Sequence, residues 1–405
     1  MSLKTGSWRV AATAGILAIA LGATGCSDGA LKAGGEQPEQ SGPVKIGMLL
    51  PTSGVYAPIA AEMKAGFELF LDENDGKLGG RDVKVIVEDT EATPEIGLRK
   101  AQKLLQEDDI DFGTGVVNSS VALQINRAFT QAQVPLVISN AFADEITGKA
   151  RSQFVFRTAQ SIHQFSYPVG KWINDELEGP LYLIASDYVA GHGVADGVRA
   201  GFEDAGGTVV GESFPPFQRT EDYQPYLSEI KSSGAKTTFA FFAGGEAVNF
   251  VKQYQQFGLK GMIPLIGPGS TTGSDVIAAE GASAEGAYTV LPYAWTIDTP
   301  RNKQFVTAYK AKVGVEPSYY ALFAYDAAQL IGLAIQDAKG DVSNGARLAT
   351  AMEGAKIDSP RGSLTIDEKT HGTIQEMYVA RIEKVNGKLT PVILKDLGSF
   401  GEQPE

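Results

Sequence analysis

The polar residues best suited to chemistry stand directly after predicted strands. Asn118-Ser119-Ser120 follows an apolar run that ends at Val117, and it opens a helical pattern. Two hydroxyls together with the free backbone N–H groups of a helix start can bind an anion such as a carboxylate. Serine is also a common N-cap, so plain capping of the helix is the alternative for Ser119 and Ser120.

A second polar loop follows the next predicted strand. Ile138-Ser139 leads into Asn140-Ala141-Phe142. The carboxyl ends of neighbouring parallel strands meet at one edge of a sheet, so Asn140 and Ala141 are expected beside Ser119. Two adjacent loops with hydroxyls and an amide indicate a binding pocket there.

Four aromatic residues occupy similar loop positions: Tyr56, Phe142, Tyr188 and Tyr320. A ring with a polar tip suits a flat apolar ligand that needs one or two directional hydrogen bonds. Taken singly, each ring is more often a core or rim residue. Four of them at loops expected to face the cleft favour a shared site.

One carboxylate has two interpretations. Glu246 follows Gly244-Gly245 at a predicted helix start. There it can pair with a cationic group of a ligand. It can equally be an acidic residue that the helix dipole stabilises in the first turn.

The sequence lacks the signatures of common enzymes and cofactor sites. The three histidines, His163, His192 and His371, have no second ligand at zinc spacing, so no metal is expected. Neither a G-x-S-x-G elbow nor a phosphate-binding P-loop occurs. The glycine runs 191–197 and 267–273 have the wrong spacing for a dinucleotide and are predicted to be tight turns. We therefore expect no cofactor and no enzyme activity.

The elements that must position these residues alternate regularly along the chain. Strands are expected at 44–50, 83–87, 112–117, 135–139, 181–185, 208–211, 238–242 and 264–266. Helices are expected between them, at about 59–75, 94–107, 121–132, 193–205, 223–233 and 247–257. Residues 154–158 and 288–291 are expected to be extended connections between the two blocks, and the last strands are expected at 377–382 and 392–394.

This alternation predicts an α/β protein with two doubly wound parallel-sheet lobes, joined by about three crossover strands. Lobe 1 is expected to hold residues 44–157 and about 290–360. Lobe 2 is expected to hold residues 158–289 and about 361–400. Loops after the strands of both sheets then face one cleft.

The N-terminus resembles the signal sequence of a bacterial lipoprotein. Lys4 and Arg9 precede the apolar run Val10–Leu21, and small residues lead to Cys26. Residues 1–25 are predicted to be a signal peptide, and the Cys26 thiol is predicted to carry the lipid. An ordinary secretory signal that happens to contain a cysteine is the alternative. Cys26 is the only cysteine, so no intrachain disulfide is possible.

Residues 26–43 are polar and contain Gly and Pro, which predicts a flexible tether between lipid and body. The protein is thus expected outside the cytoplasm, lipid-anchored to the bacterial cell membrane. The formal charge of −13 argues against nucleic acid as a partner. We expect a monomer.

Several short motifs occur together in a characteristic order: Pro51-Thr52-Ser53-Gly54, the run 75–81, Glu88-Asp89-Thr90, Ser119-Ser120, Gly258-Leu259-Lys260 and the run 264–268. With them, the chain from Pro43 onward resembles the type I periplasmic binding proteins, in their leucine/isoleucine/valine-binding branch. The resemblance implies two lobes that close on a small ligand and present it to the permease of an ABC importer. It also implies that Ser119 contacts a ligand carboxylate, with Ser120 beside it.

Two positions depart from that branch. Phe142 stands where the branch has a threonine, and Gly269 stands where its amino-acid binders have a glutamate that holds the α-ammonium. A buried ammonium without a counter-charge is costly. We therefore predict a carboxylate-bearing ligand with an apolar or aromatic body. Branched-chain amino acids or amides remain the alternative ligands, and a ligand-sensing subunit of a signalling system is the alternative role.

Overall fold

The computed structural model describes residues 42–402 apart from 178 and 274–275. The predicted signal peptide, Cys26 and the predicted tether as far as residue 41 lie outside the described residues.

The first sheet has the strand order β2-β3-β1-β4-β5-β6. Its strands are β1 (Val44–Leu50), β2 (Lys77–Leu78), β3 (Arg81–Asp89), β4 (Phe112–Gly115), β5 (Leu136–Ile138) and β6 (Val155–Arg157). All neighbours pair in parallel except β2 with β3. The central strands β1, β4 and β5 are almost wholly buried, so apolar residues and glycine dominate their sequences.

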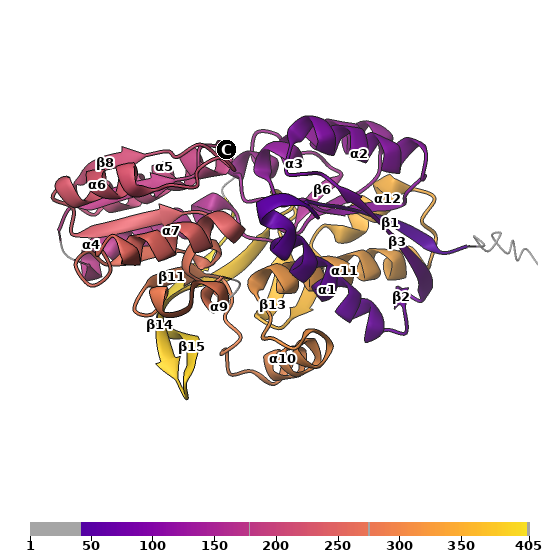
Figure 1. The fold of residues 1–405 in the computed structure, drawn as a ribbon. Coiled ribbons are helices and arrows are strands. Elements are labelled where there is room, and N and C mark those ends of the chain that lie inside the picture. Colours follow the sequence, from indigo (N-terminus) through magenta and orange to yellow (C-terminus); the bar gives the residue numbers. More distant parts are fainter. Residues whose placement is uncertain (1–41, 178, 274–275, 403–405) are drawn as a thin grey trace, which may run out of the picture. The chain divides into compact units, whose positions relative to one another are not determined.

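Helices cover both sides of this sheet. Figure 1 shows α2 (Pro94–Gln106) and α3 (Ser119–Ala132) on one side, with α1 (Ala57–Asp72) and α11 (Tyr319–Asp337) on the other. The helices α1 and α11 can pack closely because Gly66 of α1 has no side chain. A Cβ there would lie 2.0 Å from the carbonyl oxygen of Ala321 in α11. Nearby are α10 (Pro300–Val313) and α12 (Gly345–Met352).

The second sheet begins with the parallel order β8-β7-β9-β10-β11. These strands are β7 (Leu181–Ala185), β8 (Val209–Ser213), β9 (Thr237–Phe241), β10 (Leu265–Pro268) and β11 (Tyr288–Leu291). Beyond β11 the sheet continues with antiparallel pairing through β14 (Thr373–Val385), β13 (Gly362–Ile366) and β12 (Lys356–Ser359), in this order. The last strand, β15 (Lys388–Phe400), also pairs with β14 and is antiparallel to it.

The two parallel regions repeat one topology. In the first sheet, β1 lies between β3 and β4. In the second sheet, β7 lies in the same way between β8 and β9. This confirms the predicted architecture of two doubly wound lobes. The points where strand order reverses lie between β1 and β4 and between β7 and β9, and ligands bind at such points in open α/β sheets.

The second sheet buries a different core on each face. Leu181 and Leu183 face α4 (Ile162–Glu176) and α5 (Val189–Asp204), whereas Tyr182 and Ile184 face α6 (Gln224–Ser232) and α7 (Gly244–Gln256). Alternate side chains of a strand point to opposite faces, so every β7 residue is buried.

The prediction of a tight turn at 191–197 is wrong, because this run lies inside α5. Its glycines serve close packing instead. A Cβ on Gly191 would lie 1.8 Å from the Ser186 carbonyl oxygen, and a Cβ on Gly197 would lie 2.0 Å from the Ser166 hydroxyl of α4. The spacing that resembled a phosphate loop is thus a helix-packing surface.

The second predicted turn, at 267–273, is also wrong. Gly267 and Pro268 end β10, and the short helix α8 (Gly269–Thr272) follows at once. Thr271 donates a hydrogen bond to the Phe242 carbonyl oxygen at 2.8 Å and accepts one from the Phe242 N–H, also at 2.8 Å. These two bonds fix α8 against the end of β9.

The chain passes between the two lobes three times: after β6, after β11, and through β12 and β13 into β14. The buried Arg361 connects two of these passages. It donates to the Thr158 carbonyl oxygen at 2.6 Å, to the Gln375 side chain, and to the Asp326 carboxylate at 3.0 Å. We refer to Arg361, Asp326 and Gln375 as the hinge network.

The remaining described elements are short: α9 (Ile277–Glu280) and the 3-10 turns η1 (Gly54–Tyr56), η2 (Asp144–Ile146) and η3 (Gly281–Ser283). None of the described helices has both the length and the apolar character needed to cross a membrane.

Candidate functional site

A pocket lies where strand ends of both sheets meet, and we call it the interlobe pocket. From the first lobe it is lined by Tyr56, Val117, Ser119, Asn140, Phe142 and Tyr320, and from the second by Tyr188, Ala190, Phe241, Ala243 and Ser270. Apart from Tyr320 of α11, these residues end or follow β1, β4, β5, β7, β9 and β10. Parallel sheets present ligand sites at this edge.

The lining residues are uncharged and closely spaced. They leave about 10 Å³ between them, which is the space of one water-sized sphere. Five lining side chains are aromatic rings and three of these carry a phenol hydroxyl. The pocket therefore offers flat apolar walls with neutral hydrogen-bonding groups.

The two serines at the start of α3 have different environments. Asn118 is the N-cap, because its Oδ1 accepts hydrogen bonds from the N–H groups of Ser120 at 2.7 Å and Val121 at 3.3 Å. Ser119 does not cap the helix. Its Oγ accepts the Ala143 N–H at 3.1 Å, which leaves the hydroxyl hydrogen free to donate. Ser119 is buried and lines the pocket, whereas Ser120 is half-buried and does not.

Asn140 lines the pocket, and its amide oxygen is buried. Its Nδ2 points to the Val117 carbonyl oxygen at 3.5 Å, and its Oδ1 has no hydrogen-bond partner among the described residues. Exchanging the amide oxygen and nitrogen would bring two carbonyl oxygens together, which fixes this orientation. Ala141 is buried beside it, outside the pocket lining.

Arg157 holds the loop that contains Asn140 and Phe142. Its guanidinium donates to the carbonyl oxygens of Ala141 at 3.3 Å and Ala143 at 2.7 Å. The charge of this buried side chain is balanced by the Glu402 carboxylate, at 2.8 to 2.9 Å. The segment after β15 thus reaches back to the ligand-facing loop of the first sheet.

Tyr56 and Tyr188 connect the two lobes across the pocket. Their phenol groups are hydrogen-bonded, and Phe217 packs on both rings, at centroid distances of 5.7 and 4.7 Å. Burial holds the pKa of both phenols above the usual value, and the nearby Glu246 carboxylate adds to this effect. Both groups stay protonated near neutral pH and can donate hydrogen bonds.

Tyr320 is positioned by the start of α11. The Ser318 hydroxyl caps this helix by accepting the Tyr320 N–H at 3.1 Å, and it donates to the Glu62 carboxylate of α1. The phenol of Tyr319 donates to that of Tyr320 at 3.3 Å. Burial raises the pKa of Glu62 to about 7.

Glu246 lies behind the pocket rather than in its lining. It is 4 % exposed, accepts the Gln218 N–H at 2.8 Å, and accepts the Ser186 hydroxyl at 3.2 to 3.3 Å. Burial raises its pKa to about 7, since those two bonds only partly offset desolvation. Glu246 does lie in the first turn of α7, as the dipole interpretation requires, yet it is buried beside Tyr56 and Tyr188.

Gly269 has a steric reason to lack a side chain. A Cβ there would lie 2.1 Å from the ring of Tyr319, which belongs to the other lobe. The ring occupies the space that a glutamate side chain would need. Phe142 also packs near this ring, at a centroid distance of 6.4 Å.

Sequence reasoning missed five lining residues: Val117, Ala190, Phe241, Ala243 and Ser270. Ser270 is the most important of them, because it is 1 % exposed and its Oγ has no partner among the described residues. It follows the end of β10 by two residues, so the strand-end rule that selected Ser119 applies equally to it.

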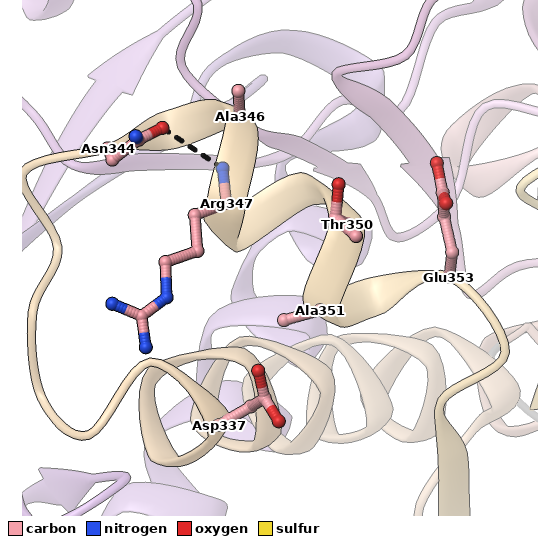
Figure 2. Close-up of a pocket in the computed structure, with 7 residues that line it drawn as sticks. All are labelled: Asp337, Asn344, Ala346, Arg347, Thr350, Ala351 and Glu353. Carbon is pink, nitrogen blue, oxygen red and sulfur yellow. Dashed lines mark hydrogen bonds between the residues drawn. The ribbon is translucent and has the colours of Figure 1, made fainter.

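A larger hollow of about 540 Å³ lies on the surface beside α12 (Figure 2). Its lining includes the exposed side chains of Arg347 and Asp337, and Asn344 caps α12 by accepting the Arg347 N–H at 3.1 Å. Gly345 packs against Gln133 and Pro135, which precede β5. The hollow is therefore at the amino end of the strand, the opposite edge from the interlobe pocket, and we assign the site to the latter.

Among the described residues, no three or more His, Cys, Asp or Glu side chains form a group that could hold a metal ion.

Comparison with known protein families gives one extended match. The family model described as "Periplasmic binding protein" matches residues 43–388. A relative in Brucella melitensis biotype 1, the Leu/Ile/Val-binding protein homolog 6, is 31% identical over 348 residues, which are 85% of this chain and 88% of the relative.

Two solved structures of solute-binding proteins of ABC transporters are similar over almost their whole length. One, from R. palustris in complex with benzoate, shares 32% identity with a TM-score of 0.84 and covers 88% of this chain and 97% of its own. The other, from Rhodopseudomonas palustris BisB5 in complex with 3,4-dihydroxybenzoic acid, shares 29% identity with a TM-score of 0.85 and covers 89% and 98%.

Proposed function

The chain belongs to the periplasmic binding protein family, and from this premise we propose that it receives an aromatic carboxylate for an ABC importer. It is a solute-binding receptor of the ABC transporter type. The ligand class, the importer and the lipid anchor are our proposals.

The composition of the interlobe pocket carries the proposal on the ligand. Five aromatic side chains and no charged ones line it. Rings favour stacking or edge contacts with another ring. A carboxylate can be held by neutral donors in such a site, and the Ser119 hydroxyl is free to donate. Tyr56, Tyr188 and Tyr320 supply further hydroxyls.

The solutes of similar proteins support the same class. The R. palustris proteins were solved with benzoate and with 3,4-dihydroxybenzoic acid. The Brucella relative is named for leucine, isoleucine and valine, so a branched-chain amino acid is the second candidate. Glu246 favours that candidate because its carboxylate lies behind Tyr56 and Tyr188, where it can attract an ammonium group.

Binding of a ring requires movement of the two lobes. A benzene-sized ligand needs on the order of 150 Å³, whereas the pocket offers about 10 Å³. We propose that the lobes separate about the three crossovers to admit the ligand and then close on it. No covalent step is needed, and we propose that the protein is not an enzyme.

Isothermal titration calorimetry of the protein with benzoate, phenylalanine, leucine and short acyl acids tests the ligand class. We expect binding of benzoate and no measurable binding of leucine. Tight leucine binding without any benzoate binding would overturn the proposal in favour of the second candidate.

Ser119→Ala, measured with the same ligands, isolates the carboxylate contact. Loss of the hydroxyl is expected to weaken benzoate binding by about 1–3 kcal/mol. Ser120→Ala is the matched control, since Ser120 lies one residue away outside the pocket lining. Equal losses in the two variants would assign the effect to the start of α3 rather than to the ligand.

We further propose that the lipid on Cys26 holds the protein to the bacterial cell membrane on the extracytoplasmic side, next to the permease of its importer, as a monomer. The support is the lipoprotein-like sequence before Cys26. A ligand sensor with the same pocket is the alternative, and neighbouring genes for a permease and an ATPase would distinguish the two roles.

A further inference from the structure

The interlobe pocket contains two polar groups that the protein itself does not satisfy. Several described side chains have a buried polar atom without a hydrogen-bond partner, and two of them line the pocket: Asn140 through Oδ1 and Ser270 through Oγ. Asn140 is 4 % exposed and Ser270 is 1 % exposed. A buried polar group left without a partner lowers the stability of the protein.

The two groups come from opposite lobes. Asn140 follows β5 of the first sheet, and Ser270 follows β10 of the second. Each backbone is fixed by neighbouring contacts: Arg157 holds the carbonyl oxygens on both sides of Phe142, and Thr271 is bonded to Phe242. A ligand that satisfies both groups therefore bridges the lobes.

The chemistry of the two atoms selects the ligand group. Asn140 Oδ1 only accepts, and the Nδ2 of the same amide points to the Val117 carbonyl oxygen at 3.5 Å. Oδ1 therefore requires a donor and repels a carboxylate. The Ser270 hydroxyl can donate or accept. A hydroxyl group has the chemistry for both atoms, because it donates one hydrogen bond and accepts another.

An ammonium group also donates, but it suits this pocket less well. No lining side chain carries a negative charge, and the Glu246 carboxylate lies behind Tyr56 and Tyr188, bonded to Ser186 and Gln218. A buried cation requires closer compensation than this. A phenolic hydroxyl is neutral and belongs on a ring that the aromatic walls accept.

We infer that the pocket selects aromatic carboxylates that carry a ring hydroxyl, and that Asn140 and Ser270 recognise this hydroxyl while Ser119 binds the carboxylate. The inference rests on the proposed function. It adds that benzoate, which has no donor, is a poorer ligand than a hydroxybenzoate.

Titration of the full chain with benzoate and with the 2-, 3- and 4-hydroxybenzoates tests the inference. At least one hydroxybenzoate is expected to bind about 10- to 100-fold more tightly than benzoate, as one or two satisfied buried groups imply. If benzoate binds and no hydroxybenzoate binds more tightly, the inference is wrong and the proposed function stands. If none of these acids binds, the proposed function fails as well.

Substitutions then assign the selectivity to the two residues. Ser270→Ala is expected to lower the affinity for the preferred hydroxybenzoate about tenfold more than it lowers the affinity for benzoate. Benzoate binding also shows that the variant is folded. Asn140→Ala is also expected to reduce the ratio of the hydroxybenzoate affinity to the benzoate affinity. A fall in both affinities by the same factor in Ser270→Ala would show that Ser270 shapes the pocket without recognising a hydroxyl.

Discussion

Glu246 combines burial with the absence of a counter-charge in its immediate contacts. It receives hydrogen bonds from the Ser186 hydroxyl and the Gln218 N–H, and burial raises its pKa from 4.5 to about 7. Below pH 4.5 the carboxyl is protonated in both the folded and the unfolded state. As the pH rises to 7 the unfolded state ionises first, so this contribution to stability is lost over that range.

Glu246→Gln removes the ionisation and keeps the shape of the side chain. We expect the variant to be more stable than the native chain at pH 8, by up to about 3 kcal/mol, with this advantage lost at pH 4.5. Urea unfolding at the two pH values measures the difference. Glu95→Gln, on the exposed surface of α2, is the control for loss of a carboxyl group. An equal effect of Glu246→Gln at both pH values would contradict the prediction.

The lining of the pocket was partly predictable from local patterns. The rule that ligands contact loops after parallel strands selects Tyr56, Ser119, Asn140, Phe142 and Tyr188, and the structure brings all five into one pocket. Their contact with a ligand stays a prediction. The burial of Glu246 was not predictable, because it depends on the backbone of Gln218, which is distant in sequence.

Ser270 shows a different limit of the sequence pattern. Ser270 directly follows Gly269, the position at which the amino-acid binders of the branch have a glutamate. The reason for the glycine is the ring of Tyr319, which comes from α11 and so from the other lobe.

At the scale of elements, the segment after β15 contacts a residue of the first sheet, although the two are far apart in the sequence. Glu402 bonds the buried Arg157, whose guanidinium holds the carbonyl oxygens of the loop with Asn140 and Phe142. The strand β15 itself pairs with β14 of the second sheet. The segment is thus a noncovalent connection between the lobes, in addition to the three crossovers.

Glu402→Gln is expected to destabilise the fold by about 3–5 kcal/mol, because it leaves the Arg157 charge buried without its partner. Ligand affinity should fall with it, since the loop at 140–143 loses support. Thermal unfolding and calorimetry check both effects. Glu376→Gln is the matched control, because Glu376 is an exposed residue of β14. Unchanged stability in Glu402→Gln would show that Arg157 holds the loop without this carboxylate.

Most strands were predicted almost to the residue, because buried parallel strands are short continuous apolar runs. The predicted strand 181–185 has the same bounds in the structure, and the predicted extended connection 288–291 forms the strand β11. The helix α4 was not predicted, because Pro168 lies inside it and proline usually ends a helix. Its start is secured instead by a capping box of Ser161 and Gln164.

At the scale of the whole molecule, the lipid that we propose on Cys26 would determine where the two lobes work. We expect the native chain to fractionate with bacterial membranes and Cys26→Ala to lose the lipid and appear in the soluble fraction. Fractionation with mass spectrometry of the N-terminal peptide measures both. Ligand affinity of the two forms is the control, since the pocket lies in residues 56–320. A native chain without an acyl group on Cys26 would contradict the anchor.

The contact between Gly269 and the Tyr319 ring also constrains how this receptor can evolve. A glutamate at 269 would bring the negative charge that the ammonium group of an amino-acid ligand requires. Its Cβ, however, would lie 2.1 Å from a ring carbon of Tyr319, which is a steric clash. A shift in solute therefore needs two coordinated mutations in segments some fifty positions apart, one in each lobe. A variant with the glutamate at 269 but with Tyr319 unchanged would contain the steric clash. Evolution toward amino-acid binding is therefore hindered by the combination of Gly269 and Tyr319.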